Sequence, residues 1–383
     1  MLVEPTVPVR VGLIGYGLGG EVFHAPVVDA NPDMRLVTIV TSDPERQARA
    51  RARYPSTRVV DGVDALRERA AEHDLVVVCT PNVSHMPLGT TALQAGLSVV
   101  VDKPLAAAVA DGRALAELAA ERGLLLTVFQ NRRWDGDFLT LRGLLERDAL
   151  GPIVRFESRY ERWRPEPEVG AWRERGAPEE AGGLLFDLGS HLVDQALQLF
   201  GRPTHVYAEV DLRRPGVGVD DDVFVALTHA GGVRTHLWAT VTAAILGPRF
   251  RVLGLRGAFE KVGIDPQEDA LAGGAQPGGP GWGTEPEELW GRLSDGASEH
   301  RVPTEAGDYP AYYRGVVEAL RSGADPPVDV RESIEGLEVL EAARESSRTG
   351  AVVALPDPRP EGTRAPRSHG NSLRQAPDDR RPA

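Results

Sequence analysis

A glycine-rich turn near the N-terminus constrains the fold more than any other feature of this sequence. The stretch VRVGLIGYGLGGEVFHAP begins with an apolar run and has glycines at positions 15, 17 and 20. The G-x-G-x-x-G spacing, placed between a predicted strand and a predicted helix, is typical of dinucleotide-binding sites rather than of a plain flexible turn. Gly15 permits the tight turn, Gly17 lets the backbone approach a pyrophosphate, and Gly20 lets the helix pack on the strand. We therefore predict that these three glycines bind a dinucleotide.

Short apolar runs alternate with helical patterns over the first 130 residues. The runs cover residues 9–15, 36–42, 75–80, 97–102 and 124–129. Each is rich in valine or leucine on both faces, as expected for parallel strands that are covered by helices on both sides. This alternation predicts an α/β protein whose N-terminal domain, residues 1–129, is a Rossmann-type doubly wound parallel sheet.

Composition and charge exclude several classes of partner. The net charge of −13 over 383 residues argues against nucleic acid, because phosphate backbones are bound by basic surfaces. No run approaches the ~18 consecutive apolar residues of a membrane span, and the N-terminus lacks the pattern of a signal peptide. Cys79 is the only cysteine, so an internal disulfide is impossible and a cytoplasmic location is expected. We expect no metal site.

The end of the second predicted strand indicates which dinucleotide binds. NAD is usually held there by a carboxylate on the ribose 2′-hydroxyl. Here the strand ends at Thr41 and Ser42, Asp43 comes one position late, and Arg46 follows one helical turn further. A small hydroxyl and an arginine suit a 2′-phosphate, so we predict NADP, with Ser42 and Arg46 as ligands. Binding of NAD through Asp43 is the alternative.

Two more predicted strands end in polar residues that face the same crevice. Ligands of open α/β sheets lie beyond the carboxyl ends of the strands, which predicts cofactor contacts from Thr80, Asn82, Asp102 and Lys103. Lys103 is notable because only two of the 43 basic residues are lysines. A lysine ammonium is a compact charge suited to lie beside an oxygen that gains negative charge.

A second group of polar residues lies in the segment EEAGGLLFDLGSHLVDQALQLFG, which we predict to be helical from Asp187. Asp187, His191, Asp194, Gln195 and Gln198 share one narrow stripe of that helix, and apolar side chains cover the rest. Asp187 and His191 are four residues apart and therefore neighbours. A carboxylate in that position is expected to orient the imidazole and to stabilise its protonated form.

Taken together, these motifs resemble the Gfo/Idh/MocA oxidoreductases. The resemblance rests on the glycine triplet, TPN at 80–82, the strand-end DKP at 102–104, and GG followed by D-x-G-x-H-x-x-D at 182–194. Further stretches resemble the branch that holds the NADP-dependent scyllo-inositol dehydrogenases: FQNRRWDGDFLTL (129–141), WRPE (163–166), GIDPQEDAL (263–271) and DYPAYYRGV (308–316). The resemblance covers roughly residues 9–355. Asp102 stands where most members have glutamate, and the Lys103–Pro104 bond is expected to be cis.

The resemblance implies catalytic roles for Lys103, Asp187 and His191 at a carbinol carbon that exchanges a hydride with the nicotinamide. His191, oriented by Asp187, would accept the hydroxyl proton, and Lys103 would stabilise the alkoxide. Lys103 as the base remains an alternative. The expected substrate is an inositol or sugar, with a sugar phosphate or another carbonyl compound as the second possibility. A cofactor-sensing regulator without activity is the third.

Residues 130–355 are expected to form a substrate and oligomerisation domain. Strands predicted at 152–163, 204–212, 223–230, 233–241 and 249–257 indicate a largely antiparallel sheet, with the helix that begins at Asp187 laid against one face. Family members with such sheets commonly pair face to face, which implies a homodimer or homotetramer. Arg164 and Trp172 are candidate substrate contacts, as are Arg132, Arg133 and Arg173.

Two segments without regular patterning complete the chain. A Gly/Pro-rich loop at 272–288 is expected to lie near the site or in a subunit contact. The Pro- and Arg-rich tail, residues 356–383, lacks apolar periodicity and is expected to be disordered.

Overall fold

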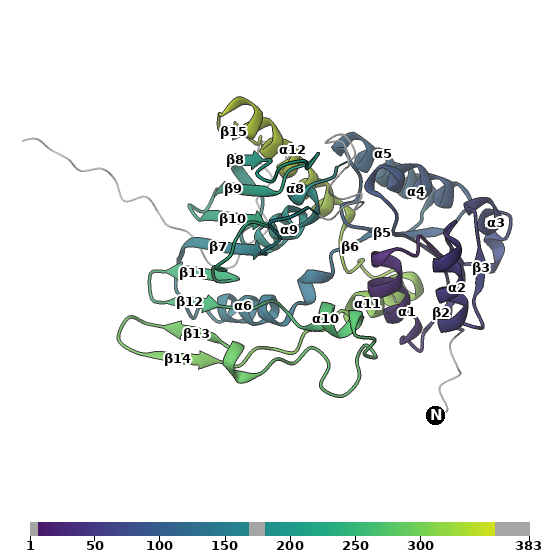
Figure 1. Cartoon of the computed structure of the whole chain (residues 1–383), viewed down its shortest axis with the longest axis horizontal. Coiled ribbons are helices and arrows are strands. Elements are labelled where there is room, and N and C mark those ends of the chain that lie inside the picture. The colour runs from purple at the N-terminus through teal and green to yellow at the C-terminus, as the bar shows by residue number, and fades with distance from the viewer. Residues whose placement is uncertain (1–6, 168–180, 357–383) are drawn as a thin grey trace, which may run out of the picture.

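The computed structural model describes residues 7–167 and 181–356, and its two sheets lie side by side (Figure 1). The N-terminal sheet has six parallel strands in the order β3-β2-β1-β4-β5-β6. This is the Rossmann order, so the predicted doubly wound sheet is confirmed. The strands are β1 Val9–Ile14, β2 Met34–Val40, β3 Arg58–Val60, β4 Leu75–Val78, β5 Ser98–Asp102 and β6 Leu126–Phe129.

The helices of this half follow the strand ends. The glycine turn leads into η1, a π-helical segment, which continues as α1, and α5 ends at Gly123 in the left-handed conformation expected of a C-cap. The elements are η1 Gly19–His24, α1 Ala25–Asp29, α2 Pro44–Arg53, α3 Val63–Arg67, η2 Ala70–Glu72, η3 Asn82–Ser84, α4 His85–Gln94 and α5 Val109–Arg122. Strand β3 was not predicted, because three residues are too short to show a pattern.

The second sheet has nine strands in the order β14-β13-β12-β11-β7-β10-β9-β8-β15. Every neighbouring pair is antiparallel except β7 with β10, which confirms a largely antiparallel sheet. Gly231 and Gly232 lie in the turn that joins β9 and β10 as an antiparallel pair. The strands are β7 Ile153–Glu161, β8 Pro203–Asp211, β9 Asp222–His229, β10 Arg234–Thr240, β11 Phe250–Gly254, β12 Ala258–Lys261, β13 Gly291–Ser294, β14 Glu299–Val302 and β15 Val353–Ala354.

The outer part of this sheet departs from the sequence prediction. The strand predicted at 249–257 ends at Gly254, and a tight turn follows before β12. Strands β13, β14 and β15 were also missed, because each has at most four residues and little apolar alternation.

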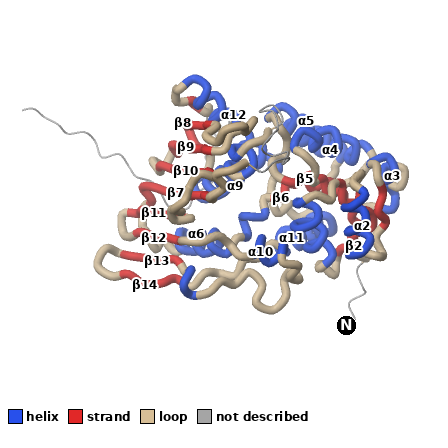
Figure 2. Tube along the Cα trace, in the orientation of Figure 1, coloured by secondary structure: helices blue, strands red, loops and turns tan. Residues whose placement is uncertain are grey.

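Helices and short helical segments fill the space between and around the sheets (Figure 2). They are η4 Asn131–Trp134, α6 Gly136–Glu146, α8 Leu184–Asp187, α9 Gly189–Phe200, α10 Gln267–Ala272, η6 Glu287–Leu289, α11 Pro310–Ser322 and α12 Val330–Thr349. Helix α9 packs on β10, and α12 packs on β8. The single helix predicted from Asp187 is wrong in one respect: it is interrupted at Leu188, so Asp187 ends α8 and His191 lies in the first turn of α9.

The last two long helices connect the two halves. Helix α11 packs against α1, and α12 packs against both α5 and α9. The backbone N–H of Val109 donates to Glu341 of α12 (2.8 Å), and the Thr127 hydroxyl donates to the carbonyl oxygen of Val328 (2.8 Å). None of the described helices is long and apolar enough to cross a membrane.

The Gly/Pro-rich loop at 272–288 is anchored to the C-terminal half at two points. Lys261 is buried, and its ammonium donates to Glu285 at the end of the loop (3.1 Å). The indole N–H of Trp282 donates to the side chain of Gln267 (2.9 Å). The second lysine of the chain therefore holds this loop in place. Residues 357–383 of the predicted tail and the segment with Trp172 lie outside the described residues.

Candidate active site

The glycine turn at the end of β1 is shaped by close backbone contacts. Gly15 has φ = +102°, and a Cβ there would lie 2.3 Å from the carbonyl oxygen of Cys79. A Cβ on Gly20 would lie 2.1 Å from the carbonyl oxygen of Gly15. Gly17 differs, because the nearest atom to a Cβ there is Nη1 of Arg46 at 3.7 Å. Gly15 and Gly20 are thus needed for the turn itself, and Gly17 leaves backbone exposed beside the guanidinium of Arg46.

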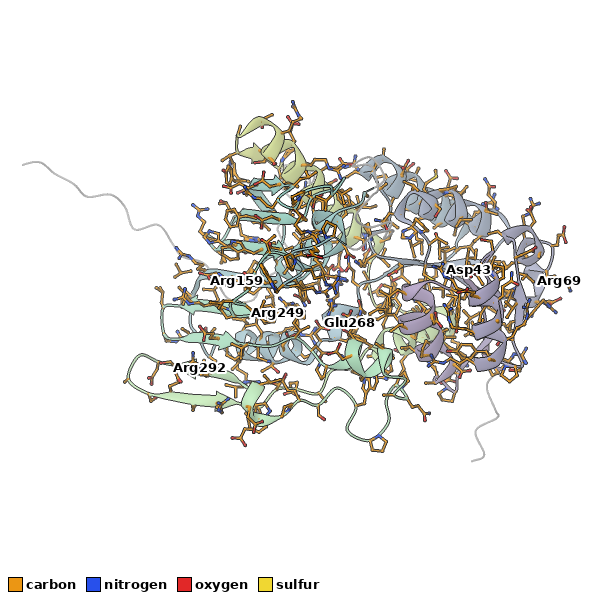
Figure 3. All side chains as sticks on the ribbon, in the orientation of Figure 1. Asp43, Arg69, Arg159, Arg249, Glu268 and Arg292 are labelled. Carbon is orange, nitrogen blue, oxygen red and sulfur yellow. The ribbon has the colours of Figure 1, made fainter. Side chains whose placement is uncertain are left out.

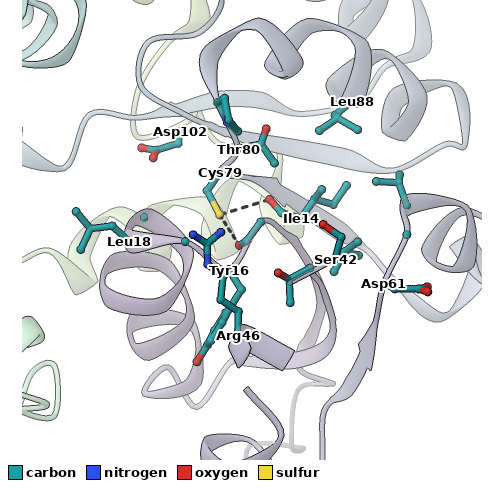
Figure 4. Close-up of a pocket in the computed structure, with 18 residues that line it drawn as sticks. Ile14, Tyr16, Leu18, Ser42, Arg46, Asp61, Cys79, Thr80, Leu88 and Asp102 are labelled. Atoms are coloured by element: carbon teal, nitrogen blue, oxygen red, sulfur yellow. Dashed lines mark hydrogen bonds between the residues drawn. The ribbon is translucent and has the colours of Figure 1, made fainter. Parts of the chain in front are cut away.

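A pocket of about 490 Å³ extends from this turn over the carboxyl ends of the strands (Figure 4). Of the predicted cofactor ligands, Gly15, Gly17, Ser42, Arg46, Thr80 and Asp102 line it. Gly20, Asn82 and Lys103 are not among the lining residues. The sequence reasoning missed several others that do line it, including Tyr16, Leu18, Gly19, Asp61, Cys79 and Leu88. The size and the turn beneath it fit a nucleotide cofactor.

Asp43 does not line this pocket, because it is the N-cap of α2. Its carboxylate accepts hydrogen bonds from the backbone N–H groups of Glu45 (2.9 Å) and Arg46 (3.1 Å). These bonds lower the pKa of Asp43, chiefly through the N–H of Arg46. The carboxylate that could have bound the ribose of NAD is therefore used to begin the helix.

Asn82 has a structural role instead of a place in the pocket wall. Its side-chain amide is buried and donates to the carbonyl oxygen of Ala181 (2.8 Å), just before the glycine pair that precedes α8. Asn82 therefore ties the loop after β4 to the C-terminal half rather than facing the pocket.

Asp102 lies at the opposite end of the pocket from Asp61 (Figure 4), and a buried histidine lies next to its carboxylate. His24 of η1 is fully buried, its Nε2 lies 3.7 Å from Asp102 Oδ1, and its Nδ1 bonds to the Tyr313 hydroxyl of α11 (2.6 Å). Burial would raise the pKa of Asp102, but His24 and Lys103 outweigh it, so the pKa lies below the ordinary value. The carboxylate that faces the cofactor pocket is thus held in its charged form.

Lys103 connects the two halves at the centre of the molecule. Its ammonium donates to both the carboxylate (2.7 Å) and the backbone oxygen (2.6 Å) of Asp187, and its side chain is only 14% exposed. The Lys103–Pro104 bond is cis, as expected. An ammonium has three donors, and two of them are used in these contacts.

His191 lies close to this ion pair in the first turn of α9. Its ring is buried, and Nδ1 has no hydrogen-bond partner among the described residues. Burial and the positive charges of Lys103 and Arg132 lower the pKa of His191 well below its usual value, although Asp187 acts in the opposite direction. The imidazole is therefore neutral at pH 7. Asp187 contacts Lys103, and its charge also acts on the His191 ring.

The remaining stripe residues of α9 face buried charges rather than an open cleft. Asp194 forms a two-bond ion pair with Arg133 (2.6 and 2.9 Å), which also contacts Glu332. Gln195 donates to the carbonyl oxygen of Arg132 (2.9 Å). Gln198 is exposed. Beyond the first turn of α9, tertiary partners therefore engage Asp194 and Gln195, whereas Gln198 faces solvent.

The candidate substrate residues fall into four groups. Arg133 is fully engaged by Asp194 and Glu332, so it stabilises the fold. Arg164 has an exposed side chain, and its backbone bonds to Val241. Trp172 and Arg173 are not among the described residues. Arg132, by contrast, is buried near His191.

Two residues at the site were missed from the sequence. Glu268 of α10 accepts a hydrogen bond from Arg132 (2.5 Å), and Arg249 donates to Gln195 of α9 (2.7 Å). Figure 3 shows Glu268 between the two halves, with Arg249 to its left, on the side of the nine-stranded sheet. Glu268 lies in the stretch GIDPQEDAL. From the sequence, this stretch stands out only for its resemblance to other sequences, which gives no role to Glu268.

Two family models match the chain: the oxidoreductase family NAD-binding Rossmann fold at residues 9–130, and the oxidoreductase family C-terminal α/β domain at 142–355. The chain is 37% identical over 352 residues to the scyllo-inositol 2-dehydrogenase (NADP(+)) IolW of Bacillus subtilis, covering 91% of this chain and 96% of that protein. It is 39% identical over 351 residues to the uncharacterized oxidoreductase YdgJ of Escherichia coli, covering 91% and 99%. The structure of the putative oxidoreductase yvaA of Bacillus subtilis matches with a TM-score of 0.87 and 35% identity, covering 92% and 100%.

Proposed function

The chain belongs to the Gfo/Idh/MocA oxidoreductases, and from this premise we propose that it is an NADP-dependent dehydrogenase of an inositol or a closely related sugar. The observation on which the proposal rests is the cluster of Lys103, Asp187 and His191 next to the cofactor pocket. An ammonium and a neutral imidazole near one carboxylate are the groups that oxidation of an alcohol requires. The similarity to IolW over nearly the whole chain supports an inositol as substrate.

Two features support NADP as the cofactor. The turn leaves no room for a Cβ at Gly15 and Gly20, and the nearest atom to a Cβ at Gly17 is Nη1 of Arg46 at 3.7 Å, a geometry that suits a pyrophosphate at the start of the following helix. Ser42 and Arg46 line the pocket where β2 ends, and the carboxylate of Asp43 is occupied as the cap of α2. A hydroxyl and a guanidinium would bind a 2′-phosphate. Asp102 would hold the ribose at the other end.

His191 is the group that we assign as general base. Because its pKa is lowered, the imidazole is neutral at pH 7 and can accept a proton from the substrate hydroxyl. Its Nδ1 lacks a partner among the described residues, so the ring is not committed to a structural hydrogen bond at that atom. The chemistry that the cofactor supplies when bound is acceptance of the hydride from the carbinol carbon.

Lys103 is the group that we assign to the oxygen. Asp187 and its backbone carbonyl orient the ammonium through two of its donors, which leaves the third for the substrate oxygen. The interaction strengthens as that oxygen gains negative charge, and so it lowers the barrier. Asp187 thus acts by positioning Lys103, and we revise its role accordingly.

We also propose that the protein is a homo-oligomer that pairs through the open face of the nine-stranded sheet. Residues alternate between buried and half-exposed along β9 and β10, and the half-exposed set includes Phe224, His236 and Trp238. The guanidinium of Arg159 lies 4.0 Å above the Trp238 ring on this face. Half-exposed aromatic and arginine side chains are enriched at protein interfaces. Sedimentation analysis would show a single monomeric species if this is wrong.

The test of the activity is spectrophotometric. Purified protein is mixed with NADP or NAD and a panel of inositols and neutral sugars, and formation of the reduced cofactor is followed. We expect turnover with at least one inositol and a higher kcat/KM with NADP. Tight cofactor binding without turnover of any panel member would contradict the proposal and favour a cofactor-sensing regulator.

A further inference from the structure

Two stretches with no assigned role, NRRW and GIDPQEDAL, meet at the cleft. Arg132 lies in η4, directly after the last strand of the N-terminal sheet, and Glu268 lies in the first turn of α10. Nη2 of Arg132 donates to Oε2 of Glu268 (2.5 Å), although the residues are 136 positions apart. Helix α10 packs against η1, the segment that follows the glycine turn. The pair therefore lies on an element that packs against the segment following the cofactor-binding turn.

The two members of this pair differ in exposure. The Arg132 side chain is 6% exposed and that of Glu268 is 30% exposed. Nε and Nη1 of Arg132 have no hydrogen-bond partner among the described residues, although Nη1 lies 3.5 Å from Oδ2 of Asp135. Buried donors are nearly always satisfied by protein, water or ligand. Arg132 thus retains donor capacity next to a carboxylate that is open to the cleft.

The pair is adjacent to the catalytic cluster. Gln195 of α9 holds the carbonyl oxygen of Arg132 (2.9 Å), and the same helix carries His191 one turn earlier. The charge of Arg132 contributes to the low pKa of His191. Burial would raise the pKa of Glu268, but Arg132 and, less strongly, Arg162 outweigh it and the pKa is lowered, while Asp187 acts weakly against this. Glu268 is therefore a carboxylate within electrostatic reach of the residue that positions Lys103.

Two cations of the site, Lys103 at the reacting oxygen and Arg132 beside it, already have anionic partners. Asp187 neutralises Lys103, and Glu268 neutralises Arg132. A phosphate or carboxylate in the substrate would have to displace Glu268 or lie beside its negative charge in a poorly solvated site, which is unfavourable. A hydroxyl meets no such penalty, because it can donate to the carboxylate and accept from the guanidinium.

We propose that Arg132 and Glu268 form a subsite for neighbouring hydroxyl groups, and that Glu268 makes the enzyme select neutral polyols over sugar phosphates and sugar acids. The inference rests on the proposed function and deepens it, because it narrows the substrate class. Glu268 is in this sense a specificity residue: it contacts the substrate away from the carbon that is oxidised.

The test compares Glu268→Gln with a matched variant on the same helix. Asp269 follows Glu268 and has an exposed side chain, so Asp269→Asn removes a charge from α10 without changing the cleft. Steady-state constants are measured with NADP and three substrates: an inositol, its monophosphate and a hexuronic acid. For Glu268→Gln we expect the preference for the neutral inositol over its monophosphate to fall by about tenfold or more. The effect should arise mainly in KM, and Asp269→Asn should retain the wild-type ratio.

Two further measurements make the outcome decisive. Calorimetric titration of the inositol into each enzyme–NADPH complex, which cannot oxidise it, reports on the subsite without turnover, and weaker binding to Glu268→Gln than to Asp269→Asn is expected. If Glu268→Gln does not fold, Glu268→Asp is measured instead. It keeps the negative charge on a side chain that is one methylene shorter, and it should raise KM for the inositol. An unchanged ratio and unchanged binding in a folded variant would overturn the inference. Absence of turnover and of inositol binding in the wild-type protein would instead overturn the proposed function.

Discussion

The cofactor pocket and the cleft wall are built in different ways. The pocket is assembled from short contiguous segments at strand ends, such as the glycine turn at 15–20 and the segment at 41–46. The cleft wall is assembled from charged pairs whose members are far apart in the chain, namely Lys103 with Asp187 and Arg132 with Glu268. The comparison teaches that the residues lining the cofactor pocket all come from the N-terminal half, whereas the Lys103–Asp187 pair forms only where the two halves meet.

Removal of a group that acts on the reacting hydroxyl should have the largest effect and should separate catalysis from cofactor binding. We expect Lys103→Met and His191→Ala each to lower kcat by at least about a hundredfold, because each removes a group that acts on the reacting hydroxyl. NADP affinity, measured by fluorescence titration, should change little. Wild-type turnover in either variant would remove that residue from the mechanism.

At the glycine turn, two glycines should respond differently to the same added methyl group. Gly20→Ala places a Cβ 2.1 Å from a backbone oxygen, so we expect a loss of about 1–3 kcal/mol in the free energy of unfolding together with weaker NADP binding. Gly17→Ala meets only Nη1 of Arg46 at 3.7 Å and should fold with near-wild-type stability. Thermal and denaturant unfolding measure both. Equal destabilisation of the two variants would show that the turn is shaped differently.

A substitution in the cofactor pocket should change the cofactor preference while the charged pairs of the cleft wall stay intact. Ser42→Asp adds a carboxylate to the pocket beside Arg46, and we expect the NADP-to-NAD ratio of kcat/KM to fall by about tenfold or more, since a hydrogen bond to a charged group is worth ~1.5–3 kcal/mol. Asp43→Asn should leave the ratio nearly unchanged, because Asp43 caps α2 instead. A shift of the ratio in Asp43→Asn would contradict this assignment.

The pH dependence of kcat/KM should report on the charges around His191. The change expected here is the smallest of those predicted. Its pKa is lowered by burial and by Lys103, Arg132 and Arg249, so the base is active at neutral pH and becomes protonated only in acid. We therefore expect kcat/KM to fall with decreasing pH at values below about 6.5. Asp187→Asn removes a charge that raises this pKa and should move the acid limb lower, by up to about one pH unit. An acid limb that moves upward would contradict the assignment of His191.

The difference between the cofactor pocket and the cleft wall also explains which features could be predicted from the sequence. The Rossmann sheet was predictable because each strand, apart from the three-residue β3, is a buried Val- or Leu-rich run followed by a helix. The break at Leu188 was not, because it depends on Asp187 being held by Lys103 from the other half. Glu268 was not assigned because nothing in its neighbours along the chain marks a partner 136 residues away.

The C-terminal helices also have a consequence for recombining this enzyme with its relatives. Tyr313 of α11 supports His24 behind Asp102, Glu341 of α12 accepts the N–H that begins α5, and Arg321 contacts Asp33 (2.7 Å). The coenzyme-binding half is thus completed by the last part of the polypeptide. A chimera that exchanges residues 1–129 alone would sever these contacts. Exchange of cofactor specificity between relatives should succeed only when α11 and α12 are transplanted with the N-terminal half.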